Sequence, residues 1–207
     1  MKKEDLNKTK EVVSVLNGQP LRSLDRAGSL ITANFGDLVE CELACYDESG
    51  KLVRDENGEV ICKKIMSGKL ALDITCSMRL SCGDKILLAK SDVFLPNSQL
   101  VKNSKMESKE IFDWDSFNWA IRGNNYFDEM IAKYIGTEPF EFIVDKVKVS
   151  ELGDLSIYFK NGFVLESFID GSGDSENWCF YETSCEDFGL VVFGDGIEKL
   201  TCNNDKV

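Results

Sequence analysis

The sequence contains no histidine, and this single absence removes several kinds of chemistry. Serine–histidine and cysteine–histidine nucleophilic sites need an imidazole, as do histidine-ligated metal centres. Neither a glycine-rich dinucleotide fingerprint nor a phosphate-binding P-loop occurs in the chain. The sequence therefore favours no histidine-dependent enzyme class, and we expect no cofactor.

Long apolar runs are missing as well. No run approaches the roughly 20 apolar residues that a membrane-spanning helix needs. The first residues, MKKEDLNKTKEVVSVL, lack the apolar core and the small-residue cleavage site of a secretory signal. These two features predict a cytoplasmic protein that has no membrane partner.

Basic residues are fewer than acidic residues in this chain. The chain has 24 lysines and arginines against 36 aspartates and glutamates, which gives a net charge of −12. The lysines are scattered, so no basic patch opposes the repulsion that a phosphate backbone would meet. We therefore expect no nucleic acid as partner, whereas binding to a basic protein is compatible with the charge. An acidic surface that only maintains solubility is the alternative.

The eight cysteines include no C-x-x-C pair. In the absence of a secretory signal, reduced thiols are expected rather than disulfides. Cys41 and Cys45 would lie on one face of a strand, about 13 Å apart, which is too far to share a zinc ion. The glycine–aspartate loop at 170–174 lacks the ligand spacing of a calcium loop. We therefore predict no metal site, and cysteines that act as small buried apolar residues.

Most of the chain alternates between apolar and polar residues at the period of a β-strand. Gly36–Asp37 predicts a turn between two strands. Residues 69–80 are predicted to form one strand that carries Arg79 on the face opposite its apolar side chains. Residues 86–94 are its predicted return strand, and Pro96 ends it.

Two segments have helical features. Residues 4–17 predict a short amphipathic helix. A second helix is predicted around 127–135, with Asn124 as its N-cap and Gly136 at its end. Between the strands and this helix, the polar residues 97–110 are the predicted linker.

The predicted fold class is α+β, mostly antiparallel β, in one globular domain over residues 1–207. Similar strand, turn and acidic-loop patterns predict two similar β-units in tandem, at 21–96 and 138–200, joined by residues 97–137 with a connecting helix. Asn161–Gly162 predicts a tight hairpin turn in the second unit. Because hairpins share turn chemistry, a chance similarity of the two halves is the alternative.

Four residues are candidates for binding: Arg79, Trp114, Glu176 and Trp178. Arg79 would contact an anion or a partner, or else form an ion pair with a carboxylate such as Asp92 or Glu176. The tryptophans would anchor an interface, or else pack in the core with their N–H groups hydrogen-bonded at its rim.

Neighbouring carboxylates allow an enzymatic interpretation. Asp113 with Asp115, or Asp174 with Glu176, could perform acid–base catalysis of the kind that glycosidases use. The sequence predicts no apolar pocket that would raise their pKa values, so solvated loop edges are the alternative.

Two short motifs carry a resemblance to a known family. Residues 71–79 (ALDITCSMR) resemble a pattern A-L-H-x-Q-C-P-W-R, and residues 176–179 (ENWC) resemble E-x-W-R. The chain is similar here to an uncharacterised family of small bacterial proteins. Asp73 replaces the histidine and Met78 the tryptophan, while the cysteine and the arginine of the first motif match. The resemblance implies an immunity-type protein, and the missing histidine and second arginine argue against catalysis at these positions.

The leading hypothesis is a non-enzymatic protein that binds a basic protein or a toxin domain, as an immunity-type antitoxin. One alternative is a module for small molecules or carbohydrates that uses an aromatic surface near Trp114 and Trp178. The other is a carboxylate-dependent hydrolase.

Overall fold

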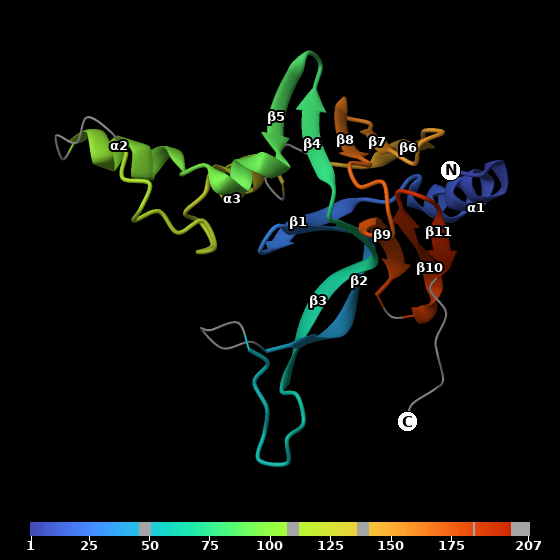
Figure 1. The fold of residues 1–207 in the computed structure, drawn as a ribbon, viewed down its shortest axis with the longest axis horizontal. Helices are drawn as coiled ribbons and strands as arrows, with labels where there is room; N and C mark the ends of the chain where they lie inside the picture. The colour runs from blue at the N-terminus through green and yellow to red at the C-terminus, as the bar shows by residue number, and fades with distance from the viewer. Residues whose placement is uncertain (46–50, 107–111, 136–140, 184, 200–207) are drawn as a thin grey trace.

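Two antiparallel sheets enclose the main apolar core of the protein (Figure 1). The computed structural model describes residues 1–45, 51–106, 112–135, 141–183 and 185–199. The helices and strands follow in chain order as α1 (Lys3–Val13), η1 (Ser14–Leu16), β1 (Leu21–Ala27), β2 (Leu30–Ala44), β3 (Cys62–Ile74), β4 (Ser77–Cys82), β5 (Lys85–Ala89), η2 (Lys90–Phe94), α2 (Ser98–Met106), α3 (Tyr126–Tyr134), β6 (Val144–Val149), β7 (Leu155–Phe159), β8 (Phe163–Phe168), β9 (Glu176–Glu182), β10 (Cys185–Phe193) and β11 (Ile197–Lys199).

The two sheets confirm the predicted α+β class with mostly antiparallel strands. The larger sheet has the strand order β1-β2-β3-β9-β10-β11, and the smaller sheet has the order β5-β4-β8-β7-β6. The predicted first helix is present as α1 followed by η1. No helix in the described part of the chain is long and apolar enough to cross a membrane.

The alternating pattern of β7 and β8 shows how the sequence builds the core. Leu155, Ile157 and Phe159 are buried, and the residues between them are half-buried. Asn161–Gly162 forms the predicted turn, with Gly162 at φ 87°, and β8 returns with Phe163 buried against the same core. Burial contributes about 1.5–3 kcal/mol for each large apolar side chain, so this alternation fixes which face of the sheet turns inward.

The predicted strand at 69–80 is wrong, because the chain changes sheets in its middle. The backbone N–H groups of Thr75 and Cys76 both donate to the carbonyl oxygen of Asn177 at 3.0 Å. β3 ends in the larger sheet just before this point, and β4 begins in the smaller sheet just after it. The return crossing, from β8 to β9, lies beside it, since the Asp170 carboxylate accepts from the Ser77 backbone N–H at 2.8 Å.

The predicted turn at Gly36–Asp37 is also wrong. β2 runs through this point with a β-bulge, because its register against β3 shifts between Phe35 and Leu38. Gly36 has φ 84°, and its N–H donates to the Pro20 carbonyl oxygen at 2.9 Å. A glycine–aspartate pair is equally suited to a bulge and to a turn, since both use a positive φ.

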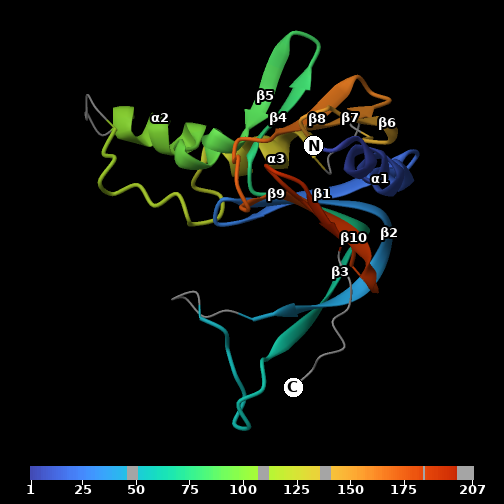
Figure 2. The same cartoon turned by 45° about the vertical axis from the view of Figure 1, so that its right-hand side comes forward.

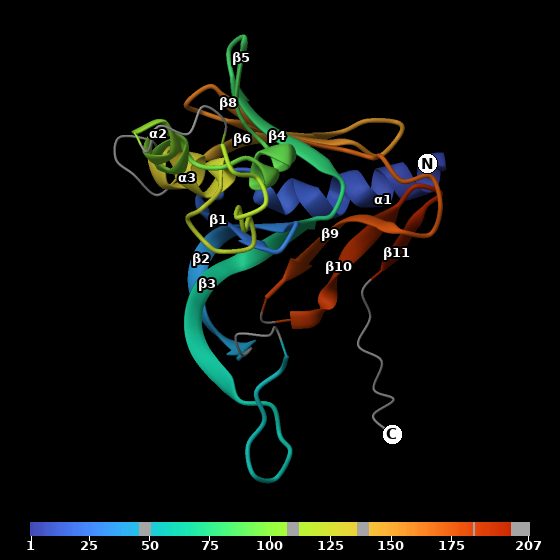
Figure 3. The same cartoon turned by 60° about the vertical axis from the view of Figure 1, so that its left-hand side comes forward.

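Beyond the bulge, β2 and β3 continue as a two-stranded ribbon that projects from the sheets (Figures 1 and 3). We call residues 38–44 and 62–68 the arm. The pairing of β1 with β2 ends at Phe35, and the pairing of β9 with β3 ends at Leu70. The arm is therefore held mainly by its own ladder of hydrogen bonds.

On another side of the sheets, α2 and α3 extend as an insertion between η2 and β6 (Figures 1 and 2). We call residues 95–106 and 112–135 the insertion. α2 occupies most of the predicted linker at 97–110, so that prediction is wrong where the structure describes it. The N-cap of α3 is Asn125, one residue after the predicted Asn124, and its side chain accepts from the Asp128 backbone N–H at 2.8 Å.

The predicted return strand at 86–94 is only partly formed. β5 ends at Ala89 because the Asp92 carboxylate accepts from the Ala89 backbone N–H at 2.8 Å. This bond caps η2, which takes up the remaining residues of the predicted strand.

The two halves have related topologies. In the larger sheet the order β1-β2-β3-β9-β10 combines three strands of the first half with two of the second. The smaller sheet repeats this arrangement with the halves exchanged, as β6-β7-β8-β4-β5. This symmetry is what two similar units at 21–96 and 138–200 would give, and their common origin stays a prediction.

Candidate functional site

Arg79 forms an ion pair within the smaller sheet. Arg79 in β4 lies directly opposite Glu166 in β8, and its Nε is 2.7 Å from a Glu166 carboxylate oxygen. Its guanidinium also lies 4.9 Å from the ring centroid of Phe168. Hydrogen bonding to Glu166 raises the pKa of Arg79 above its ordinary value. The two partners suggested by the sequence, Asp92 and Glu176, are not the ones that Arg79 contacts.

Trp178 is a core residue, so the predicted surface shared by Trp114 and Trp178 does not form. Its exposed fraction is 0%, because it points to the same side of β9 as the buried Phe180. The indole N–H donates to the Gly153 carbonyl oxygen at 3.0 Å, which satisfies its one polar group. Trp178 therefore stabilises the fold and offers no surface to a ligand.

Glu176 lies exposed at the start of β9. Partial burial raises the pKa of Glu176, and the negative charge of Asp73 raises it further. The carboxylate that influences Glu176 is thus Asp73, whereas the sequence pointed to Asp174. Asp73 accepts hydrogen bonds from the Thr32 hydroxyl at 2.6 Å and from the Tyr181 hydroxyl at 3.2 Å.

The residues around Asp73 form a polar row across the larger sheet. Asp73 lies opposite both Thr32 and Cys179 in the strand register. Burial, with the charges of Glu176 and Asp73, raises the pKa of Cys179 to about 12. Burial and Asp73 likewise raise the pKa of Tyr181. Both groups are therefore neutral at pH 7, and the row has the character of a structural hydrogen-bond network.

The six cysteines whose side chains the structure describes are free thiols, and only some match the predicted burial. Cys76 and Cys179 are buried, and burial raises the pKa of Cys76 to about 11. Cys62 is exposed, and Cys41, Cys45 and Cys82 are half-buried. Within the described ranges, no group of three or more cysteines and carboxylates is placed to hold a metal ion.

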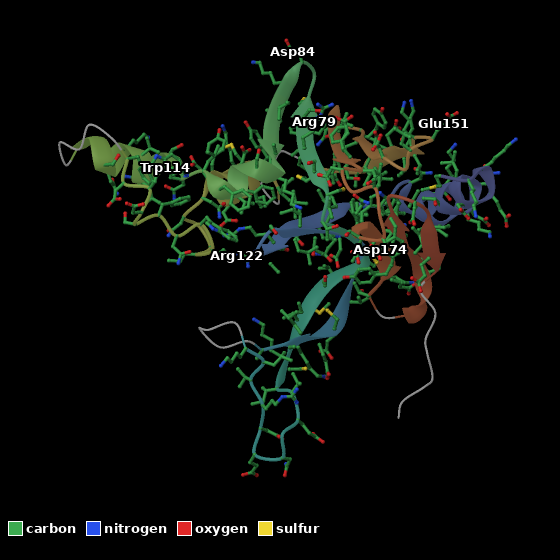
Figure 4. The ribbon with its side chains drawn as sticks, viewed as in Figure 1. Arg79, Asp84, Trp114, Arg122, Glu151 and Asp174 are labelled. Carbon is green, nitrogen blue, oxygen red and sulfur yellow. The ribbon has the colours of Figure 1, made fainter. Side chains whose placement is uncertain are left out.

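Trp114 differs from Trp178 because it is presented to solvent. It lies in a loop of the insertion, residues 112–123, which we call the Trp114 loop. Its ring makes edge-to-face contacts with Phe112 and Phe117, at centroid distances of 5.2 and 6.1 Å. Its exposed fraction is nevertheless 54%. Figure 4 shows Trp114 on the insertion, well away from the loop that carries Asp174.

Hydrogen bonds between neighbouring residues shape the turn that carries Trp114. The Asp113 carboxylate accepts from the Asp115 backbone N–H at 3.2 Å, and the Phe117 N–H donates to the Trp114 carbonyl oxygen at 3.3 Å. Asp113 and Asp115 are both exposed. The indole is therefore flanked by two carboxylates on a turn of defined shape.

A buried ion pair ties the Trp114 loop to β1. Arg26 Nε and Nη2 lie 2.7 and 2.8 Å from the two carboxylate oxygens of Asp128, and these side chains are only 4% and 10% exposed. Arg26 also donates to the carbonyl oxygens of Trp119 and Ile121 at 3.2 and 3.3 Å. Burial alone would raise the pKa of Asp128, but Arg26 and the Gly123 N–H hold it below its ordinary value.

More apolar surface surrounds this anchored loop. Phe94 packs edge-to-face on Trp119 at a centroid distance of 5.1 Å and stays largely exposed, as does Ile121. An open groove of about 510 Å³ lies on the same insertion, and its lining residues are Leu95, Pro96, Ser98, Val101, Lys102 and Tyr126. The insertion thus combines the exposed indole with other apolar side chains.

Comparison with known protein-family models and with curated proteins gave no match, and no solved structure matches this one.

Proposed function

We propose that this is a non-enzymatic protein-binding protein and that the Trp114 loop is its main contact with a basic partner protein. The exposure of Trp114 on an anchored loop carries the proposal. Exposed tryptophans held in place by neighbouring residues often dominate the binding energy of protein interfaces, because they bury a large area at little entropic cost. Trp114 has such support from Phe112 and Phe117 on one side and from the Arg26–Asp128 pair beneath the loop.

The charge around Trp114 favours a basic partner. Asp113 and Asp115 flank the indole, and the whole chain carries a net charge of −12. Such a field speeds the approach of a positively charged protein. At contact, an arginine or lysine could stack on the indole face while it pairs with a carboxylate.

In its specific form, the proposed partner is a bacterial toxin domain that this protein neutralises. The support is the resemblance of the motifs at 71–79 and 176–179 to an uncharacterised family of small bacterial proteins, which implies an immunity-type role, together with the acidic charge. Binding through a loop remote from both motifs fits a role for those motifs in the fold.

The two alternatives have less support. The ligand-binding module needed Trp114 and Trp178 on one surface, and Trp178 is buried. The hydrolase needed a carboxylate pair in a cleft, whereas Asp113 and Asp115 are exposed on a turn. Asp73, the carboxylate beside Glu176, already accepts two hydrogen bonds from the protein.

The test is the affinity of the purified protein for the product of the neighbouring gene, measured by isothermal titration calorimetry. Trp114→Ala is expected to weaken binding by at least about 2 kcal/mol, roughly 30-fold, as for other interface tryptophans. Leu152→Ala is the matched control, because Leu152 is a large apolar side chain that is 70% exposed on the β6–β7 turn. Its affinity should not change.

Two results would contradict the proposal. One is the absence of a stable partner from the same locus. The other is a complex whose affinity is the same for Trp114→Ala as for the unaltered protein.

A further inference from the structure

The arm carries a strand edge that nothing in the described structure covers. Residues 38–44 of β2 pair with β3 on one side, and the described part of β1 pairs with β2 only up to Phe35. In an antiparallel ribbon, alternate residues direct their N–H and C=O groups away from the partner strand. About half of the backbone polar groups of residues 38–44 therefore point along this edge, where no described strand pairs with them.

Folded proteins usually cover or shorten an open strand edge of this kind. A two-stranded ribbon is only marginally stable by itself in water, and open edges accept additional strands. The arm also exposes Leu38 and Met66, which are 52% and 58% accessible and are diagonal neighbours across the ribbon. An added strand would bury part of this apolar surface and pair the open backbone groups.

The side chains along the edge indicate what kind of strand would fit. Asp37, Glu40 and Glu42 are all exposed on β2. Glu40 forms an ion pair with Lys64 at 2.8 Å, and both side chains of that pair are largely exposed. Glu40 and Glu42 alternate with Val39, Cys41 and Leu43, which lie on the opposite face of the ribbon, whereas Leu38 and Met66 share the face of the two carboxylates. A neighbouring strand would therefore lie beside Glu40, Glu42 and Leu38 on one face and beside apolar groups on the other.

We propose that the open β2 edge of the arm binds an extended segment of another protein in which basic and apolar residues alternate. The main chain would pair with residues 38–44, and the basic side chains would lie beside Glu40 and Glu42. This is strand addition, in which backbone bonds supply affinity and alternate side chains supply selectivity. The inference does not depend on the Trp114 loop, because the arm and the insertion project in different directions and share no residue (Figure 1).

A second copy of the chain fits this edge poorly. Two-fold pairing of one β2 edge with another, centred between residues 40 and 42, would place Glu40 and Glu42 beside the same carboxylates of the second copy. Like charges directly opposite destabilise a strand pair. Pairing with the β3 edge, which carries Lys63 and Lys64, would match the charges, but it would be head-to-tail and would give an open-ended assembly.

The experiment uses the full chain and a synthetic blocked peptide, Lys-Val-Lys-Val-Lys-Val-Thr. A second peptide, Lys-Pro-Lys-Pro-Lys-Pro-Thr, has the same charge but cannot pair as a strand, because proline lacks the N–H. Binding is followed by fluorescence anisotropy of the labelled peptide and by hydrogen exchange of the protein. The valine peptide is expected to slow exchange at least fivefold over residues 38–44 and to leave residues 155–159 unchanged.

Charge variants separate the arm from general attraction to an acidic protein. The double variant Glu40→Gln, Glu42→Gln is expected to weaken binding of the valine peptide about five- to tenfold. The matched control, Asp84→Asn with Glu151→Gln, removes the same charge at exposed sites away from the arm (Figure 4) and should leave the affinity unchanged. Trp114→Ala should also leave it unchanged, so failure here is distinguishable from failure of the Trp114 contact.

Several results would overturn the proposal. Equal affinity for the proline peptide would show attraction without strand pairing, and an equal effect of the two double variants would show attraction without a site. Unchanged exchange over residues 38–44 would exclude the edge itself. A concentration-dependent oligomer of the protein alone would assign the edge to a second copy: loss of the oligomer in the Glu40→Gln, Glu42→Gln variant would indicate pairing with the β3 edge, and a stronger oligomer would indicate two-fold pairing of β2 edges.

Discussion

The insertion and the arm both project from the sheets and both expose apolar side chains, but they are held in different ways. A buried bidentate ion pair, Arg26 with Asp128, and the Asn125 cap fix the Trp114 loop. In the described part of the arm, Lys64 and Glu40 form an ion pair, and both of these side chains are exposed. The insertion is thus suited to recognition by a fixed side chain, and the arm to recognition by an open main chain.

The largest expected effect comes from breaking the anchor of the insertion. Arg26→Ala leaves the Asp128 carboxylate buried without its charge partner, which costs about 3–5 kcal/mol in comparable buried pairs. We expect the free energy of unfolding in urea to fall by this amount and hydrogen exchange over the Trp114 loop to accelerate.

The double variant Arg26→Met, Asp128→Leu is the control for this prediction. Because it removes both charges, it should regain much of the lost stability. A loss below about 1 kcal/mol for Arg26→Ala, with unchanged exchange in the loop, would show that the pair does not hold the insertion.

An intermediate effect is expected where the arm joins the sheet. A Cβ atom on Gly68 would lie 2.6 Å from both the backbone nitrogen and the backbone oxygen of Phe35. Backbone atoms cannot rotate away, so Gly68→Ala should destabilise the protein by about 1–3 kcal/mol, as other overpacking substitutions do. Hydrogen exchange should rise over residues 38–44 more than over β7.

Gly196→Ala is the matched glycine variant, because a Cβ there meets no atom within 4 Å. Its free energy of unfolding should change by less than about 0.5 kcal/mol. If both substitutions lowered the free energy of unfolding equally, the close approach at Gly68 would not be the cause of the destabilisation.

The smallest effect is expected for the ion pair of the arm. Lys64→Ala removes the partner of Glu40, but these side chains are 67% and 59% exposed. Exposed pairs contribute about 0–1 kcal/mol, so urea unfolding should change little compared with Arg26→Ala. A loss comparable to that of Arg26→Ala would mean that the arm and the insertion are anchored alike.

The sequence predicted the β7–β8 hairpin well, because its strands and its turn depend on local patterns. The alternation in residues 155–159 and the Asn161–Gly162 turn specify a hairpin without help from the rest of the chain. The N-cap of α3 was wrong by one position, since Asn124 and Asn125 have the same side chain and only the folded turn chooses between them.

Features that depend on distant contacts could not be predicted. The apolar alternation from Leu70 to Leu80 continues across Thr75 and Cys76, so nothing local marks the change of sheet. That change depends on bonds to Asn177, about a hundred residues away.

The candidate site was predictable only in part. Trp114 directly follows Asp113, and Trp178 lies two residues after Glu176, so the local sequence gives both an acidic neighbour; one is exposed and the other buried because the first lies in a loop and the second in β9. Arg26 and Asp128 are 102 positions apart, so their pairing leaves no local signal. The ion pair of Arg79 was predicted as a type of contact, but its partner was set by the register of β4 against β8.

The most direct test of the Trp114 contact is acrylamide quenching of tryptophan fluorescence, with and without the partner from the same locus. Trp114 is exposed, Trp119 is half-buried and Trp178 is buried, so Trp114 should supply most of the quenchable emission in the free protein. We predict that this component is lost in the complex and is missing from the Trp114→Phe variant. Quenching that stays the same when the partner is bound would contradict the proposed contact.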